Sequence, residues 1–508
     1  MLVKGTCAVV LLLLLPGVSV GTNYYVSPWG SDGNSGLSWD SAFVTLQRAA
    51  DVVVAGDSVL VEDGEYTGFD LRTGGTQVMP IVFSSYGDSV NITERNSVTP
   101  DGINIENADW VVVDGFKVTG IERAGIRVAV SEHVTVRSNT CDRNGRWGIF
   151  TGFADYALVE DNECSYSGQE HGIYFSNSAD HPIIRRNVSH HNNGCGIHMN
   201  GDESMGGDGL ITDAVIESNI IFENGHGGGS GINCDGVAES AIYNNLLYMN
   251  HASGISLYRI DASGGSSNDK VFNNTVVNAE DGRWCLNINS GSTGDTVYNN
   301  IFINLHAWRG AVSLDSSSAD YFFSDRNILV DRMSTDGGNT VISLSEWRGL
   351  GFDTNSLLAD SLDSLFQDWA TSDYHLVEGC QAVDTGTDLV LPVVQFDLDG
   401  VARPQGLGFD IGAYEREAVG AEEDDAMSDH PGRVRVSVAR SSVYFSNLRV
   451  GDVLRIYDVS GGLRVDTGGL SASVYNWDTN QVPGGVYFYE VESRSGRVRA
   501  TGKTVVLR

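Results

Sequence analysis

Basic residues, prolines and long apolar runs are all scarce in this chain of 508 residues. It has 32 Lys and Arg against 66 Asp and Glu, which gives a formal net charge of −34. A chain of this charge repels nucleic acids, so we expect no nucleic-acid partner. After residue 21 there is no run of about 18 apolar residues, so we expect no membrane span in the mature chain. The seven cysteines show no CxxC spacing of the kind that binds zinc, and we expect no organic cofactor.

Residues 1–21 have the pattern of a signal peptide. Lys4 supplies a positive start, residues 8–15 form an unbroken apolar run, and Ser19 and Gly21 are small residues of the kind that precede a cleavage site. We therefore predict a secreted protein, or one held at the outer cell surface, whose mature chain begins near Thr22.

A short strand that begins with glycine and an aliphatic residue recurs through the middle of the chain. Its copies start at Gly102, Gly125, Gly148, Gly172, Gly196, Gly231 and Gly254, in steps of 23, 23, 24, 24, 35 and 23 residues. Two degenerate copies follow at Cys285 and Ala311. The longest step contains an insertion over 201–213, and a second insertion falls around 262–269. A period of this length predicts a solenoid.

Each coil of such a solenoid contains three short strands, and strands of successive coils pair in parallel about 4.8 Å apart. Alternating side chains then point into a shared core. The expected inner stack is Ile103, Ile126, Ile149, Ile173, Ile197, Ile232 and Ile255. A second strand in each coil ends in asparagine, as at Asn139 and Asn162, and we expect these asparagines to form a hydrogen-bonded ladder in the turns. The predicted fold class is all-β, a right-handed parallel β-helix.

Cys141 and Cys164 occupy the same position in successive coils. Two interpretations fit this spacing. The pair forms a disulfide in an oxidising compartment, or it forms a stack of buried thiols that pack as small apolar side chains.

Both ends of the repeat region carry further motifs. Residues 45–54 predict a short helix that covers the first coil, and the segment before it contains Tyr24-Tyr-Val-Ser-Pro-Trp-Gly-Ser-Asp. The far end has Asp373-Tyr-His-Leu, Ala382-Val-Asp-Thr-Gly and Arg403-Pro-Gln-Gly-Leu-Gly-Phe-Asp-Ile-Gly-Ala-Tyr-Glu415. In this order the motifs resemble the opening and closing segments of secreted β-helix proteins of the pectate-lyase-like type. The resemblance covers residues 22–416 and implies the fold, with an N-terminal cap, but no particular substrate.

The last part of the chain differs from the rest in charge and pattern. Residues 417–432 form an acidic linker, and residues 433–508 contain 11 Lys and Arg against 6 Asp and Glu. Alternating apolar residues with Gly-Gly turns predict a small antiparallel β-sandwich over 433–508. Three of its segments, Leu454-Arg-Ile-Tyr-Asp-Val-Ser-Gly, Val482-Pro-Gly-Gly-Val-Tyr-Phe and Lys503-Thr-Val-Val-Leu-Arg, resemble the C-terminal sorting domain of the type IX secretion system. That resemblance implies the secretion and sorting machinery as a partner. A carbohydrate-binding or spacer sandwich is the alternative.

The outward face of the Gly-aliphatic strands collects aromatic and hydrogen-bonding side chains. Positions two and four residues after each glycine point outward, because side chains alternate along a strand. Aromatic rings and amides on a rigid sheet suit stacking and hydrogen bonding to a sugar chain, so we predict a polysaccharide partner. The predicted substrate-binding residues at these positions are Arg127, Phe150, Asn200, Asn233 and Tyr258. Trp147 and Arg283, which lie just before the glycine position of their coils, are predicted to bind the substrate as well.

The first hypothesis for the activity is a lyase that cleaves a uronate-containing glycan by β-elimination. A base removes the proton next to the uronate carboxyl group, an acid protonates the leaving oxygen, and a cation neutralises the carboxylate. The predicted base is His198 or His171 and the predicted acid is Tyr174. Arg127 or Arg283 is the predicted cation.

Other activities fit the same face. A glycoside hydrolase needs two carboxyl groups that flank the bond. The carboxylate candidates are Asp235, Glu170, Asp202 and Asp208. Many β-helix lyases use Lys or Arg as the base. The only lysines in residues 22–416 are Lys117 and Lys270, which weakens a direct transfer of the mechanism of those lyases to this chain. A non-catalytic glycan-binding or adhesin protein is the alternative from another class, and C5-epimerase chemistry is a minor third option.

The first insertion begins with an acidic loop, Gly201-Asp-Glu-Ser-Met-Gly-Gly-Asp-Gly, directly after His198 and Asn200. Carboxylate oxygens are preferred ligands of Ca²⁺. The loop therefore predicts a calcium site with Asp202, Glu203 and Asp208 as ligands. A flexible acidic loop without a metal is the alternative, and the spacing matches no EF-hand.

Overall fold

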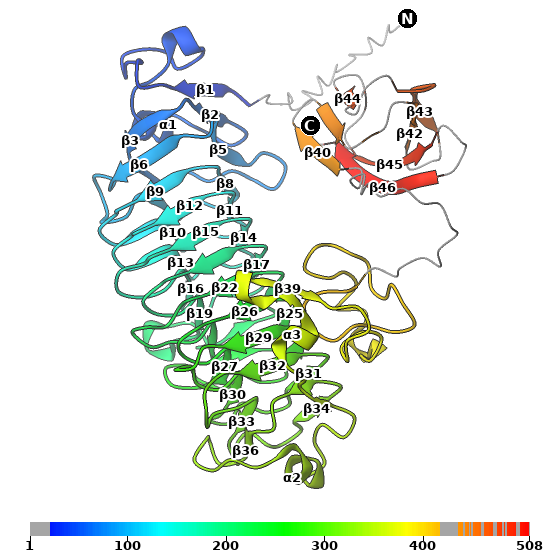
Figure 1. Cartoon of the computed structure of the whole chain (residues 1–508). Helices are drawn as coiled ribbons and strands as arrows, with labels where there is room; N and C mark the ends of the chain where they lie inside the picture. The colour runs from blue at the N-terminus through cyan, green and yellow to red at the C-terminus, as the bar shows by residue number, and fades with distance from the viewer. Residues whose placement is uncertain are drawn as a thin grey trace, which may run out of the picture. The chain divides into compact units, whose positions relative to one another are not determined.

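The computed structural model describes residues 21–416 continuously and residues 435–506 in segments. Most of the predicted signal peptide (residues 1–20) and the predicted linker (417–432) lie outside the described residues. Over 23–358 the chain winds into a parallel β-solenoid of about twelve turns (Figure 1). The predicted β-helix is therefore confirmed.

Three parallel sheets, A, B and C, form the walls of the solenoid. Sheet A consists of β1 (Asn23–Val26), β2 (Ser58–Val61), β5 (Ile81–Ser85), β8 (Val111–Asp114), β11 (Thr135–Arg137), β14 (Leu158–Glu160), β17 (Ile183–Arg185), β21 (Val215–Glu217), β25 (Ala241–Tyr243), β28 (Lys270–Phe272), β31 (Thr296–Tyr298) and β34 (Phe323–Asp325). Sheet B consists of β3 (Gly64–Thr67), β6 (Val90–Glu94), β9 (Lys117–Thr119), β12 (Thr140–Asp142), β15 (Glu163–Ser165), β18 (Val188–His190), β22 (Ile220–Phe222), β26 (Leu246–Tyr248), β29 (Thr275–Asn278), β32 (Ile301–Asn304), β35 (Ile328–Leu329) and β37 (Leu357–Leu358). Sheet C consists of β4 (Phe69–Leu71), β7 (Ile103–Glu106), β10 (Ala124–Ala129), β13 (Trp147–Gly152), β16 (Ile173–Ser176), β19 (Ile197–Asn200), β23 (Ile232–Asp235), β27 (Ile255–Tyr258), β30 (Leu286–Ile288), β33 (Val312–Leu314) and β36 (Met333–Ser334).

The predicted isoleucine stack lies in the core behind sheet C. The register pairs Ile103 with Ile126 and continues without a shift to Ile255. All seven isoleucines are fully buried. Burying one such side chain stabilises the fold by about 1.5 to 3 kcal/mol, and no coil can bury its own face without a neighbour.

Asparagines turn the chain from sheet A into sheet B, as predicted. Oδ1 of Asn162 accepts the backbone N–H of Asn139 at 3.0 Å, and Oδ1 of Asn187 accepts that of Asn162 at 3.0 Å. Nδ2 of Asn162 also donates to the carbonyl oxygen of Val136 at 2.9 Å, one coil earlier. The ladder continues through Asn219, Asn245, Asn274, Asn300 and Asn327. Each side chain satisfies backbone groups that the turn leaves unpaired and ties its coil to the next.

Short helices cover the two ends of the solenoid (Figure 1). Helix α1 (Leu46–Ala50) begins after Thr45, whose hydroxyl oxygen caps it. It ends four residues before the predicted end at Val54, because a turn follows it directly. At the other end, α2 (Leu344–Gly349) buries Trp347 in the main core.

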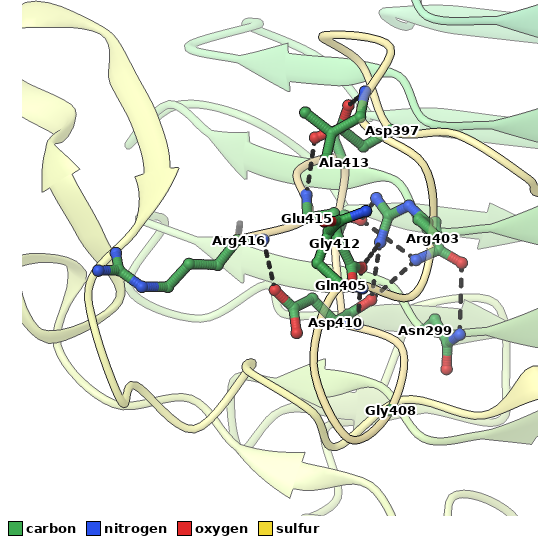
Figure 2. Close-up of polar contacts among 12 residues, drawn as sticks. Asn299, Asp397, Arg403, Gln405, Gly408, Asp410, Gly412, Ala413, Glu415 and Arg416 are labelled. Carbon is green, nitrogen blue, oxygen red and sulfur yellow. Dashed lines mark hydrogen bonds and ion pairs between the residues drawn. The ribbon is translucent and has the colours of Figure 1, made fainter. Parts of the chain in front are cut away.

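Residues 382–416, here called the closing segment, pack on the outside of the middle coils. Two side chains with no exposed surface, Arg403 and Glu415, form an ion pair at 3.0 Å in this segment (Figure 2). Arg403 also donates to the carbonyl oxygens of Asp410 and Gly412 at 3.0 and 2.7 Å. The first and last residues of the motif Arg403 to Glu415 therefore hold the segment in a closed loop.

Asn-Asn pairs in three coils form hydrogen bonds with the closing segment. The second asparagine of each pair belongs to the ladder, and the first points outward. Nδ2 of Asn273 donates to the carbonyl oxygen of Asp410 at 2.9 Å, and Nδ2 of Asn299 donates to that of Thr387 at 2.9 Å. Asn244 donates in the same way to Phe396.

Cys141 and Cys164 lie side by side in β12 and β15 as buried free thiols. Of the two interpretations of their spacing, the structure has the thiol stack.

The tail belongs to a second compact unit, residues 419–508. Its strands form two antiparallel sheets around one apolar core that includes Phe445, Leu454 and Trp477, in agreement with the predicted antiparallel β-sandwich. The first sheet contains β40 (Arg435–Ala439), β41 (Ser442–Ser446) and β44 (Tyr475–Asp478), and the second contains β42 (Val453–Asp458), β43 (Leu463–Asp466), β45 (Gly485–Glu492) and β46 (Val498–Val506). None of the helices in the described parts of the chain has the length and apolar character needed to cross a bilayer.

Two buried carboxyl groups make the stability of the solenoid depend on pH. Asp269 and Asp295 lie in turns that lead into sheet A, and Oδ1 of Asp295 accepts the backbone N–H of Asp269 at 3.0 Å. Burial raises the pKa of Asp295 to about 8, against about 3.9 in an unfolded chain. The folded state therefore holds a proton that the unfolded state releases, and stability should fall as the pH rises from about 4 to about 8.

The substitution Asp295→Asn should flatten this pH dependence, because an amide keeps the acceptor oxygen and does not ionise. We expect the free energy of unfolding of the natural chain to fall between about pH 5 and about pH 8, by up to about 1.4 kcal/mol per pH unit more than that of the variant. Urea denaturation at the two pH values measures the difference. Parallel decreases in the two proteins would show that Asp295 is not the group responsible.

Candidate functional site

Two cavities lie along the outer face of sheet C. The first has a volume of about 430 Å³ and the second about 560 Å³. The first is lined by Arg146, Trp147, Phe150, Glu170, Tyr174, Ser176, Asn177, His198, Asn200, Asp202, Met205 and Asp261. The second is lined by Gly229, Ser230, Asn233, Ser253, Ser256, Tyr258, Ile260, Arg283, Trp284, Asn287, Asn289, Ser290, Trp308, Arg309, Gly337 and Gly338. Most of the predicted substrate-binding residues therefore line one cavity or the other.

Aromatic rings form the floor of the first cavity. The rings of Tyr174 and His198 stack at 4.9 Å with an angle of 12° between their planes, and the ring of Phe150 meets Tyr174 edge to face at 5.5 Å. Glu170 fixes the rim, because its Oε2 accepts the indole N–H of Trp147 at 2.7 Å while its Oε1 accepts from Arg146 at 3.0 Å. This rigid floor can stack against the apolar faces of sugar rings.

His198 is the histidine that reaches the first cavity. Its exposed fraction is 9%, and burial lowers the pKa of the ring to about 4, so the imidazole is neutral at neutral pH. Nδ1 lies 3.2 Å from the carbonyl oxygen of Asn233 and 2.9 Å from Nδ2 of the same residue. In the tautomer in which Nδ1 donates to the carbonyl, Nε2 is the basic nitrogen, whereas in the tautomer in which Nδ1 accepts from Nδ2 the proton is on Nε2. The neutral ring of His198 can act as a general base at Nε2 in the first of these tautomers only.

Asn233 connects the two cavities. Its Nδ2 contacts Nδ1 of His198 and donates to Oη of Tyr258 at 2.6 Å, while its Oδ1 accepts from the hydroxyl of Ser230 at 3.1 Å. Because the oxygen of Tyr258 accepts this bond, its own O–H remains available to donate. Burial raises the pKa of Tyr258, so the phenol keeps its proton.

The second cavity is cationic in a strongly acidic protein. Arg283 and Arg309 line it together with Trp284 and Trp308, and no Asp or Glu does. Nη1 of Arg309 donates to the carbonyl oxygen of Gly282 at 3.4 Å, and neither arginine has an ion-pair partner among the described residues. The second cavity therefore has a positive charge, of the kind that suits an anionic group.

Three predicted site residues have their polar groups engaged by other parts of the protein. Nδ1 of His171 accepts the backbone N–H of Cys195 at 3.0 Å, which places the proton of its neutral ring on Nε2 and removes it as a base. Arg127 donates to Glu106 at 2.8 Å and lines neither cavity. Asp235 has an exposed fraction of 2%, and its two carboxylate oxygens accept backbone N–H groups of the turn over 260–262.

Two of the three predicted calcium ligands in the acidic loop after His198 use a carboxylate oxygen within the loop. Oδ1 of Asp202 accepts the N–H of Ser204 at 3.2 Å and caps a short 3₁₀ turn (Glu203–Met205), and Oδ1 of Asp208 accepts the N–H of Leu210 at 3.0 Å. Among the described residues, one group of three His, Asp or Glu brings its ligand atoms close enough to share an ion, and it lies outside this loop. Calcium binding by Asp202, Glu203 and Asp208 stays a prediction.

Trp308 and Arg309 line the second cavity but were not among the predicted site residues. A signal for Arg309 is present in the repeat, because it lies two residues before the degenerate copy at Ala311, as Arg146 lies two residues before Gly148. Gly310 takes the place of Trp147 in this coil, and Trp308 has no aromatic counterpart at its position in the coil of Gly148.

Residues 84–225 match the family described as "Right handed beta helix region". The uncharacterized protein YwoF of Bacillus subtilis (strain 168) is 26% identical over 216 residues, which span 36% of this chain and only 44% of that protein. The solved structure of pectate lyase Pel9A has 17% identity and a TM-score of 0.53, over 79% of this chain and 98% of that one. An alginate lyase from Paenibacillus sp. str. FPU-7 has 17% identity and a TM-score of 0.43, over 58% of this chain and 96% of that one. At this identity the likeness to Pel9A shows the fold alone.

Proposed function

We propose that this protein is a polysaccharide lyase that binds a uronate-containing glycan along the outer face of sheet C. The observation that carries the proposal is the pair of arginines without acidic neighbours in the second cavity. In a chain with a net charge of −34, such a cavity attracts a sugar that carries a carboxylate, as a uronate does. Trp284 and Trp308 supply rings for stacking, and the pectate lyase Pel9A has a similar fold.

The proposed reaction uses His198 of the first cavity together with Tyr258 and Arg283 of the second. The guanidinium of Arg283 pairs with the uronate carboxylate, which acidifies the neighbouring C–H bond. Nε2 of His198 removes that proton, the electron pair forms a carbon–carbon double bond, and the bond to the leaving oxygen breaks. Oη of Tyr258 donates the proton that this oxygen takes up. Tyr174, proposed from the sequence as the acid, stacks on His198 and holds its ring in place.

A screen against uronate-containing and neutral polysaccharides tests the proposal. The purified mature protein is assayed with and without calcium, and both the ultraviolet absorbance of unsaturated uronate and the release of reducing ends are followed. A lyase raises both signals on acidic glycans. If folded protein raises neither on any acidic glycan, the lyase proposal is wrong and a glycan-binding surface protein is the better interpretation.

Removal of the Arg283 guanidinium should weaken binding more than folding. A charge-assisted hydrogen bond to a carboxylate contributes about 1.5 to 3 kcal/mol, so Arg283→Ala should raise the Kd for the acidic glycan about 10- to 100-fold. Arg95→Ala is the matched control, because Arg95 is an exposed residue of an early coil that pairs with Glu122 at 3.7 Å. Equal Kd values for the two variants, measured by titration calorimetry, would contradict an anionic subsite at Arg283.

A glycoside hydrolase is the second candidate. Asp202 and Asp261 both line the first cavity, and a pair of carboxyl groups is what glycoside hydrolysis needs. Reducing ends released without new absorbance would favour this activity and identify these two residues as the first to replace.

We also propose that the protein acts outside the cell and that residues 433–508 address it to the sorting machinery. The motifs of the tail and its antiparallel β-sandwich support this proposal. A fusion of residues 433–508 to a periplasmic reporter, compared with the reporter alone in a type IX secretor, shows whether this tail is sufficient for export.

A further inference from the structure

Three potential metal ligands meet at the corner between sheets B and C, on a part of the solenoid that the proposed reaction does not use. They are Glu223, His226 and His251, and their ligand atoms all lie within 4.8 Å of one another. The two imidazole rings stack at 3.7 Å. We propose that Glu223, His226 and His251 bind a divalent transition-metal ion such as Zn²⁺.

Rigid backbone holds the two histidines in neighbouring coils. Asn224 and Asn250 form a second asparagine ladder at this corner, in which Oδ1 of Asn250 accepts the backbone N–H of Asn224 at 3.1 Å. The backbone N–H of His251 donates to the carbonyl oxygen of Asn224 at 2.8 Å. Glu223, which precedes Asn224, and His251, which follows Asn250, are therefore held in neighbouring coils, which are about 4.8 Å apart.

A glycine-rich turn brings His226 over His251. Gly225 has a φ of +91° and Gly228 a φ of +102°, values that side-chain-bearing residues rarely adopt. The N–H of Gly227 donates to the carbonyl oxygen of Asn193 at 2.8 Å, which ties the turn to the preceding coil. The turn is thus bent over the corner, and the exposed ring of His226 stacks on that of His251 with an angle of 25° between their planes.

His251 is oriented as a metal ligand usually is. Its Nδ1 lies 2.8 Å from Oδ1 of Asp281, and its Nε2 lies 2.9 Å from Oε2 of Glu223. Metal-bound histidines commonly donate their second N–H to a carboxylate, which fixes the tautomer and leaves the other nitrogen to the metal. In the proposed site, Asp281 has this orienting role, and the ion takes the place of the proton between His251 and Glu223.

The donor set selects the class of ion. Two imidazoles and one carboxylate suit Zn²⁺ and other borderline transition metals, whereas Ca²⁺ takes six to eight oxygen ligands. Zinc bonds of about 2.0 to 2.2 Å place tetrahedral ligand atoms roughly 3.3 Å apart. To reach this spacing, the exposed ring of His226 rotates out of its stack on His251, and the half-buried side chain of Glu223 shifts toward both rings.

Zinc titration of the untagged mature protein, stripped of metal with a chelator, tests the site by calorimetry. We expect one equivalent of Zn²⁺ to bind and to raise the melting temperature, and calcium not to displace it. His226→Ala and His251→Ala should each lose this binding. Asp281→Asn should weaken it about 10- to 100-fold, as expected for an orienting carboxylate. His181→Ala is the matched control, since His181 lies in another exposed turn, where it stacks on Tyr156.

Two results would overturn the proposal. One is a natural chain that binds no zinc, and the other is zinc binding that survives in both His226→Ala and His251→Ala. Because His226 is exposed and its side chain makes no hydrogen bond among the described residues, His226→Ala keeps the test valid even if His251→Ala fails to fold. Circular dichroism of the metal-free variants checks their folding.

Discussion

Replacing Arg403 with alanine is expected to lower the free energy of unfolding by about 3 to 5 kcal/mol. Both side chains are completely shielded from water. The substitution therefore leaves the carboxylate of Glu415 buried without its cation. It also removes the donors to the carbonyl oxygens of Asp410 and Gly412. Urea denaturation of the mature protein, followed by circular dichroism, measures the loss.

A matched arginine and a double variant show whether the ion pair itself is responsible. Arg416 pairs with Glu378 at 3.3 Å, but the side chain of Glu378 is 74% exposed, so Arg416→Ala should cost no more than about 1 kcal/mol. Arg403→Met combined with Glu415→Leu removes both charges and should cost less than Arg403→Ala alone. Similar losses for Arg403→Ala and Arg416→Ala would mean that burial gives the Arg403 pair no special importance.

The second large effect is expected on catalysis. If His198 is the base of the proposed lyase, His198→Gln should lower kcat about 10²- to 10⁴-fold, because general-base catalysis contributes that much. Tyr258→Phe should have a comparable effect, since it removes the proposed proton donor. Formation of unsaturated uronate on the best glycan from the screen gives the rates.

The pH profile distinguishes a base from a residue that only shapes the site. Burial lowers the pKa of His198 to about 4, and a base must be unprotonated, so the activity of the natural enzyme should fall as the pH drops through about 4. His181→Gln, in the exposed turn, should keep the full rate. A His198→Gln variant that is folded and retains most of its activity would remove His198 from the mechanism.

Much of the solenoid was predictable because the same residue types recur once in each coil. The dipeptide Gly102-Ile103 and its later copies recur with the coil, and their aliphatic side chains fill the core. The asparagines recur at the same spacing, and their side chains form the hydrogen bonds that the backbone of the turns requires. The Asn-Asn pairs were a missed signal. The second asparagine of each pair continues the ladder, but the first, as at Asn273, marks where a segment far along the chain is received.

The site was predictable in position but not in detail. The repeat places Arg127 and Arg283 on the same outer side of the solenoid, yet it gives no information about their neighbours. Arg127 meets Glu106 one coil away, whereas Arg283 has no acidic neighbour in its cavity. Asp235 likewise holds the backbone of an insertion whose path the repeat cannot specify. Charge pairing and loop capping depend on contacts between coils of unequal length, and a repeat unit does not encode them.

The closing segment affects the order in which the parts of this chain can fold during synthesis. A solenoid of neighbouring coils can grow one coil at a time, in step with synthesis. Here, however, Asn273 bonds to Asp410, 137 residues later, and contacts of such long range form late because a large loop must close first. The outer flank of the middle coils therefore stays uncovered until synthesis has passed residue 410. The chain finishes folding in its middle, and a fragment that stops before the closing segment ends with that flank open.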